Sequence, residues 1–232
     1  MANILSIETS TRVCSVAISM NKHVVVVKET HVSNSHAELI TLLCQQALLE
    51  AGLEFSGLDA VAVSQGPGSY TGLRIGVSTA KGLCYGLDIP LIAVSTLEAM
   101  ALGMIATTPH PENAVFCPMI DARRMEVYNA VFSSHLMLIN PVVATVVNED
   151  SFGNFLANHP VYFAGDGAAK CAQVLAHHIH ARFLSDFNPS ARWVATLADQ
   201  HFKDSVFADT AYFEPYYLKD FIAGIPRIKG LT

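Results

Sequence analysis

The chain has 232 residues, which is enough for one large domain or two small ones. Hydrophobic residues make up 51% of it and charged residues 15%, so the sequence predicts a sizeable core, with the apolar surplus either buried in that core or exposed for a partner to cover. The net charge of -6 and the lack of any Lys/Arg run argue against strong RNA binding by this chain alone, because phosphate contacts supply most of the affinity for RNA.

The cysteines and the first residues favour a cytoplasmic protein. Five cysteines, an odd number, are spread along the chain without a C-x-x-C pair, which is typical of reduced, buried thiols. The first residues carry no basic segment of the signal-peptide kind, and no window reaches the roughly 18 apolar residues that a membrane helix needs. We therefore expect a cytoplasmic chain without a membrane span.

Apolar periodicity in the first half predicts three successive strands, followed by alternating helices and strands. Asn21-Lys22 forms a tight turn between the second and third strands. Ser35 and Glu38 match a capping box before the first helix, and Gly52 is placed to end it. The predicted strands cover 4–9, 13–20, 23–28, 58–63 and 90–94, and the predicted helices cover 36–51, 69–85 and 95–105.

A break at residues 107–111, which contain two prolines, is the best linker candidate. Beyond it the pattern predicts strands over 114–120, 126–132, 136–147 and 161–164 and helices over 150–158, 168–181 and 191–202. Since both halves open with paired strands and then alternate with helices, the sequence predicts a duplicated α/β unit. We divide it into an N-terminal subdomain, 1–108, and a smaller, degenerate C-terminal one, 109–232, whose late helix at about 191–203 is a candidate to pack back on the first.

Residues 65–76, QGPGSYTGLRIG, are the most informative stretch. They follow a predicted strand and open a predicted helix, a place that attracts phosphate. The spacing fits neither the dinucleotide fingerprint nor the P-loop, and Pro67 removes a backbone donor. Gly72 and Gly76 share one helix face, which lets another helix approach closely. That other helix is either the one over 36–51 or a helix of another subunit.

The helix over 36–51 carries apolar residues on more than one face, so we expect one face on the sheet and another on a partner. Together with the glycine-bearing helix it forms the predicted partner interface. The residues of this interface are Leu39, Leu43, Ala47, Tyr70, Gly72, Leu73, Gly76, Val77 and Ala80.

Five stretches resemble the TsaB (YeaZ) family and span nearly the whole chain. The most specific is GPGSYTGLRIG at 66–76, and the others are IETS at 7–10, VSTL at 94–97, DARRxEVY at 121–128 and EPxYL at 214–218. The resemblance implies an actin-like, sugar-kinase-like α/β fold of two related subdomains, each a mixed sheet flanked by helices. It also implies a part in attaching threonylcarbamoyl to the anticodon-loop adenosine of tRNAs that read codons beginning with A.

The same resemblance implies partners. It predicts dimerisation with the catalytic subunit TsaD, recruitment of the ATPase TsaE, and contact with tRNA through the complex. ATP and metal are expected on the partner subunits, and no cofactor is expected on this chain. Without its partner, the chain is expected to form a homodimer through the same surface.

TsaB is similar to TsaD, so the catalytic positions of TsaD can be sought in this sequence. Thr96 and Met100 take the places of its two metal-binding histidines, and neither is expected to hold the metal. DARRM at 121–125 replaces its SGGHT turn, and Arg12 replaces the acid after its first strand. These replacements predict a non-catalytic accessory subunit rather than an enzyme. The alternative is a stand-alone actin-like ATP-dependent enzyme, either a small-molecule kinase or a protease.

A nucleotide-binding remnant is the first of two further candidate sites. The turn AGDG at 164–167 lies where actin-like proteins hold a nucleoside. It is either an ordinary turn in which Asp166 caps the next helix or part of a weak nucleotide site. The residues of that candidate site are Glu8, Thr9, Gly165, Asp166 and Gly167.

The second candidate is a charged cluster formed by Asp121, Arg123, Arg124 and Glu126. It is either an internal ion-pair network or a contact for a partner or for RNA phosphate. No metal site is predicted, because the histidines at 177–180 fit a solvated helix end better than a ligand pair. His36 is expected at the surface or at an interface.

Overall fold

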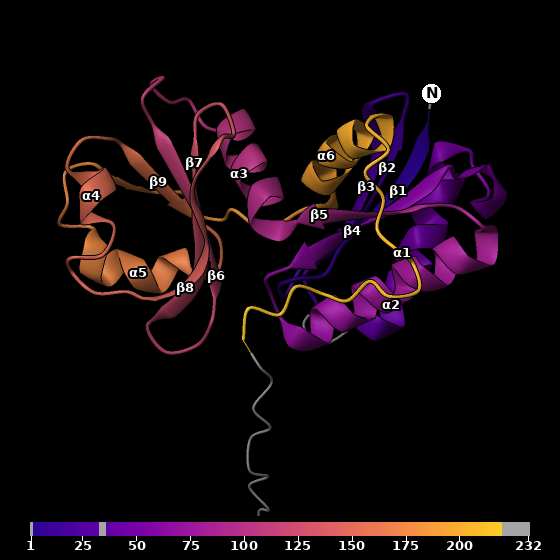
Figure 1. The fold of residues 1–232 in the computed structure, drawn as a ribbon, viewed down its shortest axis with the longest axis horizontal. Coiled ribbons are helices and arrows are strands. Elements are labelled where there is room, and N and C mark those ends of the chain that lie inside the picture. The colour runs from indigo at the N-terminus through magenta and orange to yellow at the C-terminus, as the bar shows by residue number, and fades with distance from the viewer. Residues whose placement is uncertain (1, 33–35, 220–232) are drawn as a thin grey trace, which may run out of the picture.

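The computed structural model describes residues 2–32 and 36–219 and has two lobes, each built on a five-stranded sheet (Figure 1). In the N-terminal lobe the strand order is β3-β2-β1-β4-β5, and β1 pairs antiparallel with β2 and parallel with β4. The elements of this part of the chain are β1 (Asn3–Glu8), β2 (Cys14–Met20), β3 (His23–Thr30), α1 (His36–Ala51), the 3-10 turn η1 (Phe55–Gly57), β4 (Ala60–Gly66), α2 (Tyr70–Leu87), β5 (Leu91–Ser95) and α3 (Thr96–Thr107).

Local sequence explains where these elements begin and end. Asn21 and Lys22 both have positive φ, as a two-residue turn between antiparallel strands requires. Ser69 caps α2 through its side chain, and Gly52 follows the last residue of α1 with φ 69°. Ser35, which is expected to cap α1, lies outside the described residues.

The C-terminal lobe repeats the topology of the first. Its strand order is β8-β7-β6-β9-β10, and β6 pairs antiparallel with β7 and parallel with β9, as β1 does with β2 and β4. The remaining elements are β6 (Val115–Asp121), β7 (Glu126–Ser133), β8 (Leu138–Val146), α4 (Gly153–Leu156), β9 (Val161–Ala164), α5 (Ala168–Leu175), β10 (Ala181–Phe183) and α6 (Ala191–Lys203). This repetition confirms the predicted fold class of two related α/β subdomains with mixed sheets.

Two predictions about the C-terminal lobe are wrong. The helix predicted over 150–158 is the single turn α4, and Phe152 before it has φ 62°. The helix predicted over 168–181 ends at Leu175, and a short strand, β10, follows and pairs parallel with β9. In the first segment Phe152 and Phe155 pack on the sheet, so their spacing resembles that of an apolar helix face. In the second segment the chain turns after Leu175, and β10 then pairs with β9.

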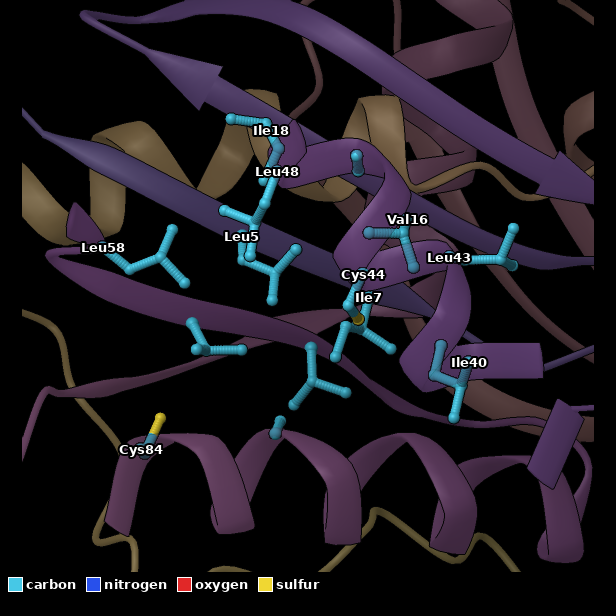
Figure 2. Close-up of a cluster of buried hydrophobic side chains, with 14 of the residues drawn as sticks. Leu5, Ile7, Val16, Ile18, Ile40, Leu43, Cys44, Leu48, Leu58 and Cys84 are labelled. Carbon is cyan, nitrogen blue, oxygen red and sulfur yellow. The ribbon is translucent and has the colours of Figure 1, made fainter. Parts of the chain in front are cut away.

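Helices cover both faces of the N-terminal sheet. α1 and α2 lie side by side on one face, where Leu43 and Leu48 of α1 pack near Val16 and Ile18 of β2 (Figure 2). α6 covers the opposite face, although it comes from the last part of the chain (Figure 1). The N-terminal lobe is therefore not one continuous segment.

α3 lies between the two lobes (Figure 1). Leu97, Met100 and Ala101 of this helix are buried with Ile120 and Phe132 of the second sheet. On its other side α3 packs against β4, β5 and α6. The two lobes thus share a small buried core around α3.

Candidate functional site

A cleft of about 600 Å³ lies between the lobes. The loop after β1 and the first turns of α1 and α2 line its N-terminal wall. The end of β6 and the loop between β9 and α5 line the opposite wall. Polar lining residues include Ser10, Arg12, Ser69, Thr71, Asp121 and Asp166.

The end of β1 lies beneath the N-terminal wall. Glu8 is fully buried, and one of its carboxyl oxygens accepts a hydrogen bond from the Ser10 N–H at 2.6 Å. Burial raises the pKa of Glu8, and hydrogen bonds from neighbouring groups, foremost Ser10, oppose that rise only in part. Thr9 is also buried, and its hydroxyl donates to the carbonyl oxygen of Gly72 at 2.8 Å. Both residues hold the loop in place under the cleft.

The glycine-rich loop uses its N–H groups within the chain. The Gly66 N–H donates to Thr96 Oγ1 at 3.1 Å, and the Ser69 N–H donates to the Ser10 carbonyl oxygen at 2.7 Å. The Gly72 N–H donates to Ser69 Oγ at 3.3 Å. A phosphate cradle needs such donors to point at the ligand, so these three contacts argue against that interpretation of the loop.

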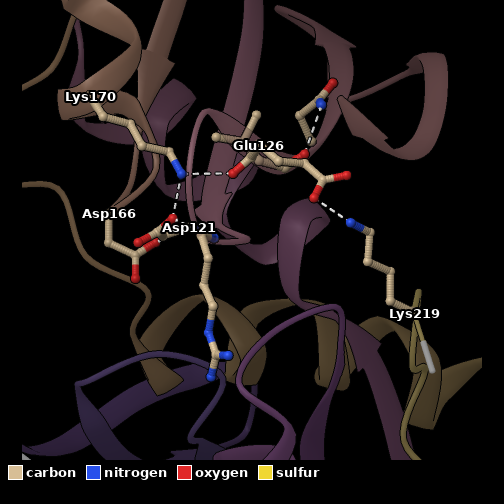
Figure 3. A network of polar contacts seen from close by, with 8 residues as sticks. Asp121, Glu126, Asp166, Lys170 and Lys219 are labelled. Atoms are coloured by element: carbon tan, nitrogen blue, oxygen red, sulfur yellow. Dashed lines mark hydrogen bonds and ion pairs between the residues drawn. The ribbon is translucent and has the colours of Figure 1, made fainter. Parts of the chain in front are cut away.

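The C-terminal wall carries the carboxyl groups of Asp121 and Asp166 (Figure 3). Lys170 pairs with Asp121 and also donates to the Glu126 carbonyl oxygen at 2.7 Å. Burial would raise the pKa of Asp121, but hydrogen bonds and charge, with Lys170 foremost, lower it below its usual value. Burial dominates at Asp166 and raises its pKa, while Arg12 from the opposite wall acts against that rise. The two walls therefore carry charges of opposite sign.

The predicted ion-pair network within the charged cluster is wrong. Glu126 pairs with Lys219, and Asp121 pairs with Lys170, so each carboxylate has a lysine outside the cluster (Figure 3). Arg123 and Arg124 are exposed in the turn between β6 and β7, both with positive φ. Their side chains are accessible to a partner or to RNA, which stays a prediction.

The residues of the predicted nucleotide remnant meet at the cleft only in part. Asp166 lines it, and one of its oxygens accepts a hydrogen bond from the Asp121 N–H at 2.8 Å. Gly165 has φ 102°, and a Cβ there would lie 2.3 Å from the Met119 carbonyl oxygen, so this glycine is required by the fold. A Cβ at Gly167 would lie 3.0 Å from the carbonyl carbon of Ile120. Nucleotide binding stays a prediction.

The residues predicted for the partner interface are mostly covered by the chain itself. Leu39 and Tyr70 are half-buried, and the other seven are buried: Leu43, Ala47, Gly72, Leu73, Gly76, Val77 and Ala80. A Cβ at Gly72 or Gly76 would lie 2.1 or 2.2 Å from an oxygen of Thr9, so these glycines admit the end of β1 rather than a helix. The prediction that these seven residues contact a partner is therefore wrong, because they face their own sheet.

The outward faces of the same two helices carry other residues, which the sequence analysis missed. Leu42 and Leu49 of α1 are 45% and 81% exposed, and Tyr85 of α2 is 87% exposed. A Cβ at Gly82 or Gly86 would meet open space. These five residues form what we call the α1–α2 outer face. If the most apolar face of each helix is assigned to the sheet on a helical wheel, these five residues are left on the opposite face.

Thr96 and Met100 have internal roles. Both are buried; the Thr96 hydroxyl accepts the Gly66 N–H, and Met100 packs between the lobes. His36 is also buried, and its Nε2 lies 3.0 Å from the Thr11 carbonyl oxygen, so a surface position is wrong, while a place at an interface stays a prediction. Within residues 2–32 and 36–219, no group of three or more side chains is arranged to hold a metal, and no helix is long and apolar enough to cross a bilayer.

Known proteins resemble this chain along most of its length. The family model for TsaD, tRNA N6-adenosine threonylcarbamoyltransferase, matches residues 25–229. The tRNA threonylcarbamoyladenosine biosynthesis protein TsaB of Haemophilus influenzae is 28% identical over 230 residues, which cover 94% of this chain and 93% of the relative. TsaB of Escherichia coli is 39% identical over 133 residues, which cover 56% of this chain and 54% of the relative.

The fold agrees with these sequence matches. The solved structure of YeaZ from Pseudomonas aeruginosa superposes with a TM-score of 0.82 at 25% identity and covers 94% of this chain and 100% of its own. Two lobes of repeated topology around a cleft define a protein with the actin-like ATPase fold. Within that class, the chain belongs to the TsaB (YeaZ) family, which the TsaD family model also covers. The resemblance inferred from the sequence is confirmed.

Proposed function

We propose that this chain is a non-catalytic subunit of the complex that attaches threonylcarbamoyl to the anticodon-loop adenosine of tRNAs that read codons beginning with A. The names of its TsaB relatives support a part in threonylcarbamoyladenosine biosynthesis. The observation that carries the non-catalytic role is the burial of Thr96 and Met100. Where TsaD places two metal-binding histidines, this chain has two side chains that are used for internal packing.

The rest of the cleft supports the same proposal. Arg12 stands in the place of an acid of TsaD and faces Asp121 and Asp166 across the cleft. Arg123 and Arg124 fill the turn where TsaD has small residues, which let backbone approach a ligand. ATP and metal are accordingly assigned to the partner subunits in this proposal.

We assign docking on the TsaD-type partner to the α1–α2 outer face. Leu49 and Tyr85 are large side chains that expose most of their surface to solvent, and aromatic residues are enriched where proteins meet. Gly82 and Gly86 have no side chains on the exposed surface of α2, so a partner helix can approach the backbone of α2 closely. In the absence of TsaD the same face serves a homodimer, and TsaE and tRNA join through the assembled complex in the cytoplasm.

Substitutions on the outer face test the docking surface. Leu49→Glu and Tyr85→Glu should each weaken capture of TsaD by at least about tenfold, as expected when a buried apolar anchor is replaced. Gly82→Arg should act similarly by placing a long side chain on the exposed surface of α2. Ile179→Glu is the matched control, because Ile179 is 80% exposed on the other lobe. Unchanged capture by all three outer-face variants would disprove this docking surface.

The accessory role itself is tested by transfer to tRNA. With TsaD, TsaE and a threonylcarbamoyl donor present, omission of this chain should abolish modification, whereas this chain alone should transfer nothing. Transfer by the isolated chain would overturn the non-catalytic assignment, whatever the docking variants do. The alternative, a stand-alone ATP-dependent enzyme, predicts micromolar Mg-ATP binding and turnover by the isolated chain, which calorimetric titration and a hydrolysis assay would detect.

A further inference from the structure

Residues 206–219, here called the C-terminal strap, follow α6 and cross from one face of the N-terminal sheet to the other (Figure 1). The strap passes the edge of the sheet at β5, where the Ala208 N–H donates to the Leu91 carbonyl oxygen at 2.8 Å. It then runs along α2, where Lys81 donates to the carbonyl oxygens of Ala211 and Phe213 at 3.1 and 2.9 Å. These contacts hold the strap on the N-terminal lobe along the length of α2.

The strap is fastened again where α2 begins. The Tyr216 N–H donates to the Gln65 carbonyl oxygen at 2.7 Å, and the Tyr217 ring lies 4.9 Å from the Tyr70 ring. Gly66 has φ 116°, and a Cβ there would lie 2.7 Å from the Tyr216 carbonyl oxygen. Part of the glycine-rich segment is therefore needed to seat the strap, as is the EPxYL stretch at 214–218.

The strap meets the C-terminal lobe through a different kind of contact. Lys219 forms an ion pair with Glu126 at the start of β7 (Figure 3). The side chains of these two residues are 44% and 20% exposed. A pair that is partly open to water contributes little, and salt weakens it further. The strap is thus held firmly on one lobe and lightly on the other.

The other contacts between the lobes are gathered around α3. The α3 core buries Leu97, Met100 and Ala101 against Ile120 and Phe132. Two stretches of chain also cross between the lobes, after α3 and before α6. The cleft lies beside the first turns of α1 and α2, and the strap reaches the second lobe from the α2 side.

We propose that the C-terminal strap is an electrostatic latch that favours the closed arrangement of the two lobes over a more open one. Lys219 and Glu126 close the latch, and the α3 core is the hinge about which the lobes separate when the pair is broken. The light contact makes the latch easy to release, by salt or by any partner that takes up Lys219. The distance across the cleft from Arg12 to Asp121 and Asp166 then depends on whether Lys219 is paired with Glu126. This inference does not depend on the proposed function.

Spin-label distances in the isolated chain test the latch. All five native cysteines are buried, so the spin label should react only with cysteines introduced at the surface. Labels at Gln46→Cys on α1 and Asn154→Cys on α4 report the distance between the two lobes. We expect a single narrow distance distribution at low salt. Lys219→Glu should broaden it and add longer distances, with the ratio of open to closed chains raised by up to about fivefold, the limit for an exposed ion pair.

Matched variants separate the latch from general effects of charge. Lys219→Glu combined with Glu126→Lys should restore the narrow distribution, and Lys203→Glu on α6 should leave it unchanged. High salt should broaden the distribution of the wild-type chain and narrow that of Lys219→Glu, because it screens both the ion pair and the repulsion that replaces it. Singly labelled chains identify any distance between copies. An unchanged distribution in Lys219→Glu, or a broadened one that the charge swap does not narrow, overturns the proposal.

Discussion

The hydroxyl of Thr9 donates a hydrogen bond to the carbonyl oxygen of Gly72 at 2.8 Å, which brings the end of β1 into backbone contact with the first turn of α2. A Cβ at Gly72 would lie 2.1 Å from the Thr9 carbonyl oxygen, and one at Gly76 would lie 2.2 Å from its hydroxyl. Only glycine fits at these two helix positions. The contact fixes the wall of the cleft relative to the sheet.

Alanine substitutions should separate this packing role from helix propensity. Gly72→Ala should lower the free energy of unfolding by about 2 kcal/mol or more, because backbone atoms of Thr9 would have to move. Gly82→Ala, on the open side of the same helix, should raise it by about 1 kcal/mol, since alanine is the better helix former. Urea denaturation of the two variants measures both effects. Equal effects of the same sign would contradict the close contact with Thr9.

Local signals in the sequence located most of the elements. Apolar runs and turn residues such as Asn21-Lys22 and Gly52 act over a few residues, so the strands and helices of the first half were predicted within a few residues of their observed bounds. The predicted helix over 150–158 failed because Phe152 and Phe155 pack on the sheet and give a helical spacing around only one helical turn. The one over 168–181 ends early because the chain turns after Leu175 and β10 pairs with β9, a contact that local spacing does not reveal.

The candidate site could be predicted only in part, because its contacts depend on tertiary structure. Periodicity marks the apolar face of α1, but it does not tell whether that face meets its own sheet or another chain; Leu43 and Ala47 meet the sheet. The lysines that contact Glu126 gave no signal in the sequence either. Lys170 and Lys219 bind Glu126 across 44 and 93 residues of sequence, and nothing in the local pattern links them.

Burial of Glu8 gives the stability of the isolated chain a pH dependence. Because burial raises its folded-state pKa above the ordinary value of 4.5, the folded chain binds this proton more tightly than the unfolded chain. The resulting stabilisation is fully present below about pH 4.5 and is lost as pH rises through the folded-state pKa. Glu8→Gln removes the ionisation, so its melting temperature should exceed that of the wild type by a margin that grows toward neutral pH.

Thermal melts of Glu8→Gln and the wild type across this pH range check that prediction. A Glu8→Gln variant whose difference from the wild type does not change with pH would mean that Glu8 titrates alike in both states.

The buried cysteines should resist thiol reagents. Burial raises the pKa of Cys14, Cys84 and Cys171 to about 11 and that of Cys44 to about 12, and it also raises the pKa of Cys117. The thiolate is the reactive form, so very little of it is present at neutral pH. An aromatic disulfide reagent should titrate no thiol rapidly in the folded chain and all five in denaturant. One fast equivalent in the folded chain would contradict this burial.

The exposed turn between β6 and β7 should contribute to tRNA binding by the assembled complex. Arg123 and Arg124 are exposed, and among the described residues neither side chain forms an ion pair, so Arg123→Gln with Arg124→Gln should leave the melting temperature unchanged. If they bind phosphate, the double variant should bind tRNA more weakly and with a salt dependence reduced by about one for each phosphate that is no longer neutralised. Arg192→Gln with Lys203→Gln on α6 removes the same charge from another surface and should change neither quantity. An equal decrease in affinity in both double variants would assign the effect to net charge, and no decrease in either would exclude the turn from RNA binding.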